Sequence, residues 1–334
     1  MKSKPVYNPN PIFTELFPGI SGNQVNGLGE ETLRRPAPFF WHKPDLHPFG
    51  GLQQRVTDYH RRSADVRETY SGDADRGPRR IEKASVSIER SDREWSDIIK
   101  QFVLEHEGDL VGITPVDPLW VYEGFEVHEP NLVMIGVAMD HARLNQAPAD
   151  FENSTAAVEV GEKYNQAARV CRELTNYILS MGYNATAFQG PYATALNMIP
   201  AAIAAGFGEL GKHGSIINRE YGSAFRLSAV STDMPLRYDT ADSFGADDFC
   251  LRCRVCSNAC PPDAIFSDKQ MVRGTEKWYV DFDKCIPYFG DTLGCAICIA
   301  RCPWSTPGRA PRLAQKWAGR RGRSAPGDDI TAGK

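Results

Sequence analysis

The chain has 334 residues, of which 42% are hydrophobic and 10% aromatic, enough for a buried core in one large domain or two smaller ones. Its formal net charge of −4 is unlike the basic face of a nucleic-acid-binding protein. No apolar stretch approaches the roughly 18 residues of a transmembrane helix, and the N-terminus has no apolar run typical of a secretory signal. The sequence therefore predicts a cytoplasmic protein without a nucleic-acid partner.

The first segment of the chain, residues 1–91, is rich in proline, glycine and charge, with a polar stretch at Ser71–Arg80. Such a composition gives no regular signal for helices or strands. Aromatic residues at Phe39, Phe40 and Trp41 nevertheless suggest that this N-terminal extension wraps a larger body.

Regular patterns begin near residue 92. Asp92 is a plausible N-cap for a helix over Glu94–Glu107, which Gly108 would end. Two short apolar and β-branched runs follow, Asp109–Thr114 and Leu132–Met139, and both predict buried strands.

A long amphipathic helix is predicted between Thr155 and Met181. Ser154 can cap its start, and Gly182 can take the left-handed conformation that ends it. Its apolar residues recur in steps of three and four, at Val160, Tyr164, Ala167, Cys171, Leu174, Ile178 and Met181.

A second helical stretch, Ala193–Gly206, contains Pro200, so it should be kinked or begin at the proline. Phe225–Ser231 then predicts another strand. Strands mixed with long helices predict an α/β or α+β core over residues 92–240.

Nine cysteines give the clearest chemical signal in the sequence. Cys171 stands alone on the apolar face of the long helix and is interpreted as a small core residue. The other eight fall within one predicted domain, residues 241–308, where the absence of an export signal favours metal binding over disulfides. They are Cys250, Cys253, Cys256, Cys260, Cys285, Cys295, Cys298 and Cys302.

The spacing of these cysteines is that of a bacterial two-cluster ferredoxin. Each half ends in C-x2-C-x3-C-P, and in such proteins the last cysteine of a run ligates the other cluster. One [4Fe–4S] cluster is therefore assigned to Cys250, Cys253, Cys256 and Cys302, and a second to Cys285, Cys295, Cys298 and Cys260. Paired structural zinc sites are the alternative, but they normally use pairs of close ligands.

The C-terminal segment, residues 309–334, carries seven basic residues against two aspartates. A solvated, frayed tail is the favoured interpretation, and a docking patch for an acidic electron donor is the alternative.

A glycine motif, Gly206-Phe-Gly208-Glu-Leu-Gly211, matches G-x-G-x-x-G. Dinucleotide binding would require a strand before it and a helix after it, and the sequence provides neither. We expect instead a loop whose backbone approaches a large planar cofactor.

Several short motifs in this order resemble the corrinoid- and iron–sulfur-dependent reductive dehalogenases over about residues 110–305. The motifs are Tyr164-Asn-Gln-Ala, Met181-Gly-Tyr-Asn-Ala185, Ala205-Gly-Phe-Gly-Glu-Leu-Gly211, Phe225-Arg-Leu227, Thr232-Asp-Met-Pro-Leu236 and Gly294-Cys-Ala-Ile-Cys298.

The resemblance implies a nitroreductase-like core that holds cobalamin beside the two clusters, with an organohalide as substrate, of which aromatic organohalides are one class. It also implies an external electron donor, such as a ferredoxin, a flavodoxin or a reductase. Tyr164 matches the family's proton-donating tyrosine and Arg226 its nearby basic residue, while Asn197 is a further candidate. A guanidinium beside Tyr164 would favour the ionised tyrosine.

Two other functions are consistent with parts of the sequence. Epoxyqueuosine reductase also combines cobalamin with a two-cluster module, but it acts on tRNA and should carry a positive surface. An electron carrier without its own chemistry would not need the 240 residues that precede the cysteines.

Overall fold

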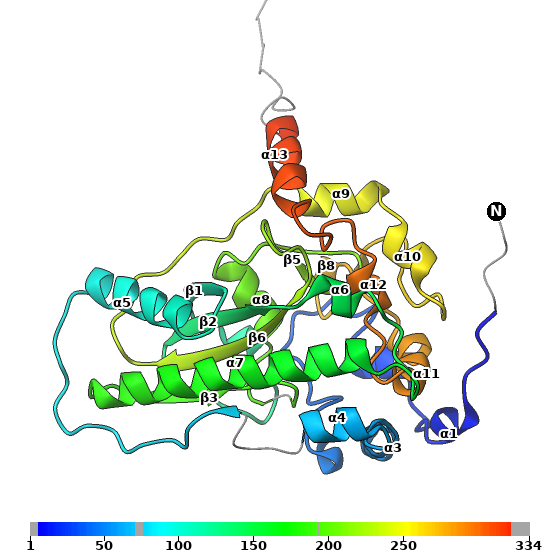
Figure 1. Ribbon diagram of the computed structural model, residues 1–334, viewed down its shortest axis with the longest axis horizontal. Coiled ribbons are helices and arrows are strands. Elements are labelled where there is room, and N and C mark those ends of the chain that lie inside the picture. Colours follow the sequence, from blue (N-terminus) through cyan, green and yellow to red (C-terminus); the bar gives the residue numbers. More distant parts are fainter. Residues whose placement is uncertain (1–5, 71–75, 193, 322–334) are drawn as a thin grey trace, which may run out of the picture.

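The computed structural model describes residues 6–70, 76–192 and 194–321, and its centre is a four-stranded antiparallel sheet in the order β1-β2-β6-β3 (Figure 1). The strands are β1 (Leu110–Pro115), β2 (Asn131–Ala138), β3 (Ala185–Phe188) and β6 (Phe225–Thr232). The three predicted strands are confirmed to within one residue at each end, and β3 is an addition. The fold is the mixed α/β class that the sequence predicts.

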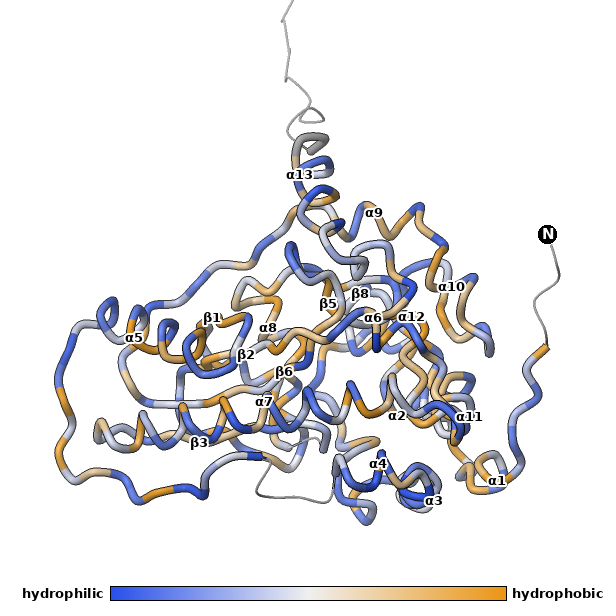
Figure 2. The backbone as a smooth tube through the Cα atoms, in the orientation of Figure 1, coloured by the Kyte–Doolittle hydropathy of each residue, from blue (hydrophilic) through white to orange (hydrophobic). Residues whose placement is uncertain are grey.

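Both faces of the sheet are buried. Val133 and Ile135 of β2 pack against α5 (Asp92–Glu105) and α7 (Thr155–Ser180). Leu132 and Met134, which point to the opposite face because side chains alternate along a strand, pack against α8 (Met198–Ala204). This explains why β2 is apolar throughout (Figure 2).

The helix ends differ in detail from the predictions. Ser91, not Asp92, caps α5, because its hydroxyl accepts from the Glu94 N–H while the Glu94 carboxylate accepts from the Ser91 N–H. Gly182 ends α7 at φ +86°, as predicted, but the Ser154 hydroxyl donates to Asp65 instead of capping. The predicted helix over Ala193–Gly206 is shorter, and Ala193 lies outside the described residues.

The N-terminal segment is helical and ordered around aromatic residues. Phe13, Phe39 and Phe49 are buried in one cluster with Ile286 of α11 (Phe282–Asp291). The insertion between Cys285 and Cys295 thus supplies the surface that this segment wraps. Its elements are α1 (Pro11–Thr14), α2 (Gly22–Val25), η1 (Pro44–Leu46), α3 (Gly50–His60) and α4 (Ala64–Thr69).

The cysteine-rich region lies at one end of the sheet (Figure 1). Its elements are α9 (Ala246–Arg252), α10 (Val255–Ala259), β7 (Gln270–Val272), β8 (Thr275–Lys277), α11 and α12 (Ile297–Ala300). Cys260 and Cys302 each lie just beyond a short helix and before a proline, as predicted.

Part of the predicted frayed tail is helical. Residues Ala310–Arg321 form α13, in which Ala310 and Ala314 are buried because they pack beside Phe249 and Trp304. The rest of that segment, residues 322–334, lies outside the described residues. The division of the chain into domains, with boundaries at residues 91, 240 and 308, stays a prediction.

The remaining short elements connect these layers. They are η3 (Pro118–Trp120), α6 (His141–Leu144), β4 (Glu209–Leu210) and β5 (Ile216–Ile217). None of the helices in the described part of the chain is long and apolar enough to span a membrane.

Candidate active site

Four cysteines from α9, α10 and the segments that follow α9 and α12 are close enough to affect one another, and we call them the outer cysteine group. They are Cys250, Cys253, Cys256 and Cys302. Burial, with a smaller contribution from the neighbouring thiols of the group, raises the pKa of Cys250 to about 12. Burial also raises the pKa of Cys302 to about 12, and the thiols of Cys256 and Cys253 contribute to this shift. The fourth member therefore comes from the distant end of the cysteine-rich region.

The other four form the inner cysteine group, which consists of Cys260, Cys285, Cys295 and Cys298. Burial raises the pKa of Cys285 to about 12, with smaller contributions from Cys295, Cys260 and Asp281. Burial also raises the pKa of Cys298 well above its usual value, with contributions from Cys295, Cys285, Cys256 and Cys260. Cys256 belongs to the outer group, so the two groups adjoin.

Each group is suited to a polynuclear cluster. The four thiols of each group match in number the ligands of a [4Fe–4S] cluster, in which each iron takes one cysteine. Backbone N–H groups already point at two of the sulfurs, from Lys212 to Cys250 at 3.5 Å and from Ala264 to Cys260 at 3.4 Å.

The glutamate of the glycine motif, Glu209 in β4, holds the start of the cysteine-rich region. The Glu209 carboxylate accepts hydrogen bonds from the N–H groups of Phe244, Gly245 and Ala246, at 2.7–2.9 Å. These residues begin α9, which carries Cys250. An acidic side chain at a helix N-terminus is favourable because the free N–H groups there need acceptors.

The three glycines of this motif serve close packing within the chain. A side chain on Gly208, at φ +127°, would lie 2.0 Å from the Ile217 carbonyl oxygen, and one on Gly206 would lie 2.9 Å from that of Thr240. One on Gly211 would meet His213 and Ile217 at 2.8 Å. None of the three lines a cavity described below, so their contact with a cofactor stays a prediction.

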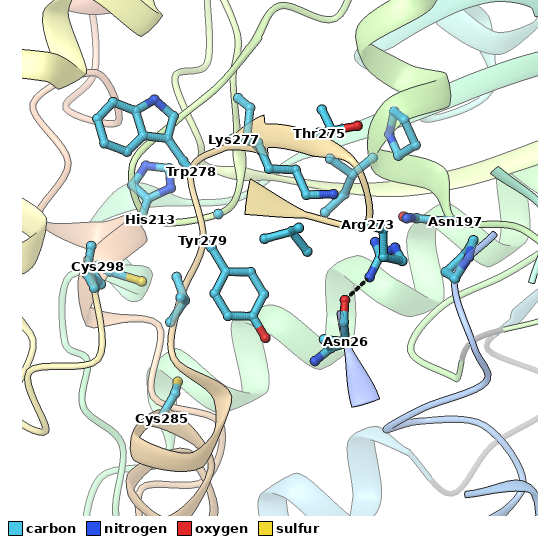
Figure 3. A pocket seen from close by; sticks show the side chains of 18 of the residues that line it. Asn26, Asn197, His213, Arg273, Thr275, Lys277, Trp278, Tyr279, Cys285 and Cys298 are labelled. Carbon is cyan, nitrogen blue, oxygen red and sulfur yellow. Dashed lines mark hydrogen bonds between the residues drawn. The ribbon is translucent and has the colours of Figure 1, made fainter. Parts of the chain in front are cut away.

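A cavity of about 710 Å³, which we call the large cavity, is lined by all four inner cysteines. Figure 3 shows two of them, Cys285 and Cys298. Its other walls come from the N-terminal segment, α8 and the β7–β8 hairpin, and its surface is mostly apolar. Asn197 lines it at the start of α8. His213 also lines it; burial lowers the pKa of this histidine to about 4, so the imidazole is neutral.

A second cavity of about 290 Å³ shares Cys285, Cys295 and Cys298 with the first. We call it the tyrosine cavity because Tyr70, Tyr164 and Tyr192 line it. Trp41 and Phe289 add to its aromatic surface.

Tyr164 and Arg226 meet in the tyrosine cavity. The Arg226 guanidinium carbon lies 5.2 Å from the centroid of the Tyr164 ring. Alternation along β6 places Arg226 on the face that packs against α7, which carries Tyr164. The structure thus brings together two of the three predicted catalytic residues. It places Asn197 elsewhere, because α8 covers the opposite face of the sheet.

The Arg226 guanidinium places a positive charge beside Tyr164. Its Nε is buried and has no hydrogen-bond partner within the described part of the chain, so it is available as a donor. Burial raises the pKa of Tyr70, and Tyr164 raises it further while Arg226 lowers it. Gly190 packs on the ring of Tyr164, since a side chain there would lie 2.4 Å from its Cε1 atom.

Sequence reasoning missed two sets of cavity residues. Tyr70 comes from the segment to which no fold was assigned, and no pattern marks it. Trp41 was identified only as part of an aromatic cluster in that segment and not as a cavity residue. Arg273 and Lys277 lie on the β7–β8 hairpin. Its turn could have been found from Arg273-Gly274, which both have positive φ as a two-residue hairpin turn requires.

Comparison with known protein families identifies the type of domain that the cysteine-rich region forms. The profile of the 4Fe-4S dicluster domain matches residues 249–306. The chain therefore contains an iron–sulfur domain of the type that its cysteine spacing predicts.

Comparison with whole proteins confirms the resemblance to reductive dehalogenases. The chain is 28% identical over 211 residues to the tetrachloroethene reductive dehalogenase of Dehalobacter restrictus, covering 59% of this chain and 37% of the relative. It is also 33% identical over 121 residues to the epoxyqueuosine reductase of Cyclobacterium marinum, covering 31% of this chain and 35% of the relative. The chain thus spans little more than a third of these relatives.

Solved structures support the fold. The catabolic reductive dehalogenase NpRdhA, in complex with 3-bromo-4-hydroxybenzoic acid, superposes with a TM-score of 0.64 at 24% identity. The match covers 82% of this chain and 39% of that one.

Proposed function

We propose that this chain is a reductive dehalogenase-like oxidoreductase, which replaces a halogen of an organic substrate by hydrogen with electrons passed through two [4Fe–4S] clusters to a corrinoid. The observation that carries the proposal is the Tyr164–Arg226 pair in a cavity that shares three thiols with a larger, apolar one. A proton source, a cofactor-sized space and an electron source thus adjoin.

The outer group would hold one cluster and the inner group the other, with Cys302 and Cys260 exchanged between the two halves of the sequence. Buried thiols with raised pKa values ionise only beside a strong positive charge, which iron supplies. Cys256 of the outer group lies near enough to Cys298 of the inner group to affect its pKa, and this proximity would bring the clusters close enough for electrons to pass.

The large cavity fits a corrinoid. Its volume of about 710 Å³ is in the range of cofactor sites, and the surface is apolar with a few polar groups such as Asn197. When bound there, a reduced corrinoid supplies the electrons that break the carbon–halogen bond. The inner cysteines would form the wall from which those electrons arrive.

Tyr164 would supply the proton. Reductive dehalogenation consumes two electrons and one proton, releases halide and forms a carbon–hydrogen bond. The Tyr164 hydroxyl holds a transferable proton in the tyrosine cavity, and the Arg226 guanidinium beside it stabilises negative charge that develops on the phenol oxygen. Arg226 can also attract an anionic substrate through its free Nε donor.

The substrate would be an aromatic organohalide. Tyr70, Tyr192, Trp41 and Phe289 offer ring surfaces on which an aromatic molecule can pack. The brominated hydroxybenzoate in the NpRdhA complex is a compound of this kind. A ferredoxin, flavodoxin or reductase would provide electrons from outside, in the cytoplasm.

The test is anaerobic reconstitution with iron, sulfide and cobalamin, followed by single turnover with 3-bromo-4-hydroxybenzoate. We expect absorption from both clusters and corrinoid, and release of one bromide per two electrons. Protein that binds clusters but no corrinoid would instead be an electron carrier. Reduction of an epoxyqueuosine-containing tRNA stem loop, without bromide release, would identify the other corrinoid reaction.

A further inference from the structure

A buried lysine lies beside the outer cysteine group. Lys212 follows the glycine motif directly, in the turn that joins β4 to β5, and it is only 2% exposed. Lysine is almost never fully buried unless its charge has a partner. The burial of Lys212 therefore indicates an anion nearby.

Two contacts place Lys212 against the outer group. Its backbone N–H donates to the Sγ atom of Cys250 at 3.5 Å. Its Nζ atom lies 4.8 Å from the centroid of the Trp278 ring, which packs in one cluster with Cys250 and Cys302. Burial raises the pKa of Cys256 to about 11, whereas the charge of Lys212 acts in the opposite direction, so the ammonium group lies near this thiol as well.

Lys212 forms no ion pair with a carboxylate in the described ranges. Asp247, which also contacts Trp278, accepts from the Trp278 Nε1 at 2.6 Å and pairs with the Lys269 Nζ at 2.6 Å. The Glu209 carboxylate accepts from the backbone N–H groups that begin α9. Lys269 and Asp247 thus cancel each other, and the positive charge of Lys212 remains.

The ring of Trp278 compensates this charge only in part. A cation–π contact offsets some of the cost of removing an ammonium group from water, but a buried charge normally needs an opposite charge. The four outer cysteines would supply it, because a [4Fe–4S] cluster with four thiolate ligands carries a net negative charge.

We propose that Lys212 raises the reduction potential of the cluster in the outer group, an inference that rests on the cluster assignment within the proposed function. Uptake of one electron makes the cluster more negative by one charge, and a nearby cation stabilises that reduced form. The hydrogen bond from the Lys212 N–H to Cys250 acts in the same direction, since hydrogen bonds to the sulfurs also set the potential. Lys212 would thus set the potential at which the outer cluster accepts an electron.

The experiment is a stepwise reduction of the reconstituted iron–sulfur protein with dithionite, without corrinoid, followed by electron paramagnetic resonance. In Lys212→Gln, the equilibrium constant for one-electron reduction of the outer cluster should fall about 10-fold, which corresponds to a potential lower by about 59 mV. The potential of the inner cluster should change less. Cys302→Ser, which should lack the outer cluster, identifies the signal that belongs to it.

Two variants separate charge from packing. Lys212→Arg keeps the positive charge and should keep the potential of the wild type. Lys83→Gln removes the same charge from an exposed position near the C-terminal end of α7, remote from the cysteine-rich region (Figure 1), and should leave both potentials unchanged. Iron content and melting temperature report whether each variant is folded.

An unchanged outer potential in Lys212→Gln would overturn this inference, and so would an equal decrease in Lys212→Arg. If Lys212→Gln cannot retain the outer cluster, retention by Lys212→Arg would support the role as counter-charge, whereas loss from both would make Lys212 a packing residue. A wild-type protein without an outer cluster would refute the cluster assignment and this inference together. A lowered potential in Lys212→Gln, in a protein whose corrinoid-loaded form releases no halide, would remove only the proposed function.

Discussion

The outer and inner cysteine groups have the same chemistry but different surroundings. The outer group lines neither cavity, and two of its members, Cys250 and Cys302, pack in one cluster with Phe249, Trp278 and Trp304. The inner group forms a wall of the large cavity, and three of its members also border the tyrosine cavity. The difference indicates a direction: electrons would enter at the outer group and leave from the inner one.

The surface near the outer group is consistent with entry there. Leu251 and Val255, which flank Cys253, are 58% and 42% exposed. Arg252 and Arg254 are also exposed beside them. Two exposed apolar residues and two exposed arginines therefore lie beside the outer group.

The largest effects are expected from variants that remove one thiol from one of the two cysteine groups. Cys302→Ser should remove the outer cluster, and Cys285→Ser the inner one, so each variant should lose about half its iron and acid-labile sulfide while turnover disappears. Iron analysis with electron paramagnetic resonance of the reduced protein measures this. If Cys302→Ser instead lost the cluster held by Cys285, Cys295 and Cys298, the assignment of Cys302 to the outer group would be wrong.

The next effect tests the chemistry beside the inner group. Tyr164→Phe keeps the ring against Gly190 and Arg226 but removes the hydroxyl, so single turnover should slow by about 10²- to 10⁴-fold. Iron, sulfide and corrinoid content should match the wild type. Tyr70→Phe in the same cavity is the matched control. A Tyr164→Phe rate equal to that of the wild type would make Tyr164 a packing residue only.

The smallest effect tests positioning without removing any functional group. The added methyl of Gly190→Ala would lie 2.4 Å from Cε1 of Tyr164, so the ring or its neighbour must move. A displacement of about 1 Å can cost up to 10²-fold, and we expect turnover to fall by about 10-fold with both clusters retained. Gly51→Ala in α3, where nothing lies within 4 Å, should leave turnover unchanged.

Local pattern was enough for the elements that depend on local rules. The apolar run of β2, the three- and four-residue steps of α7 and the left-handed Gly182 were all readable because periodicity and backbone sterics act within a few residues. The cysteine spacing identified the iron–sulfur domain for the same reason. Cys171 is fully buried, as its place in the helical pattern predicts.

Contacts between distant segments decided the rest. The sequence pattern around the N-terminal aromatic residues predicted no helix or strand, because these residues pack against α11, more than 200 residues away. Arg273 and Lys277 look like ordinary hairpin residues until Asn26 and α8 close the cavity around them. The pairing of Tyr164 with Arg226 depends on α7 packing on β6, whereas Asn197 was separated from them by the sheet. Such arrangements come from burying both faces of one sheet, a constraint on the whole chain that no short window of sequence contains.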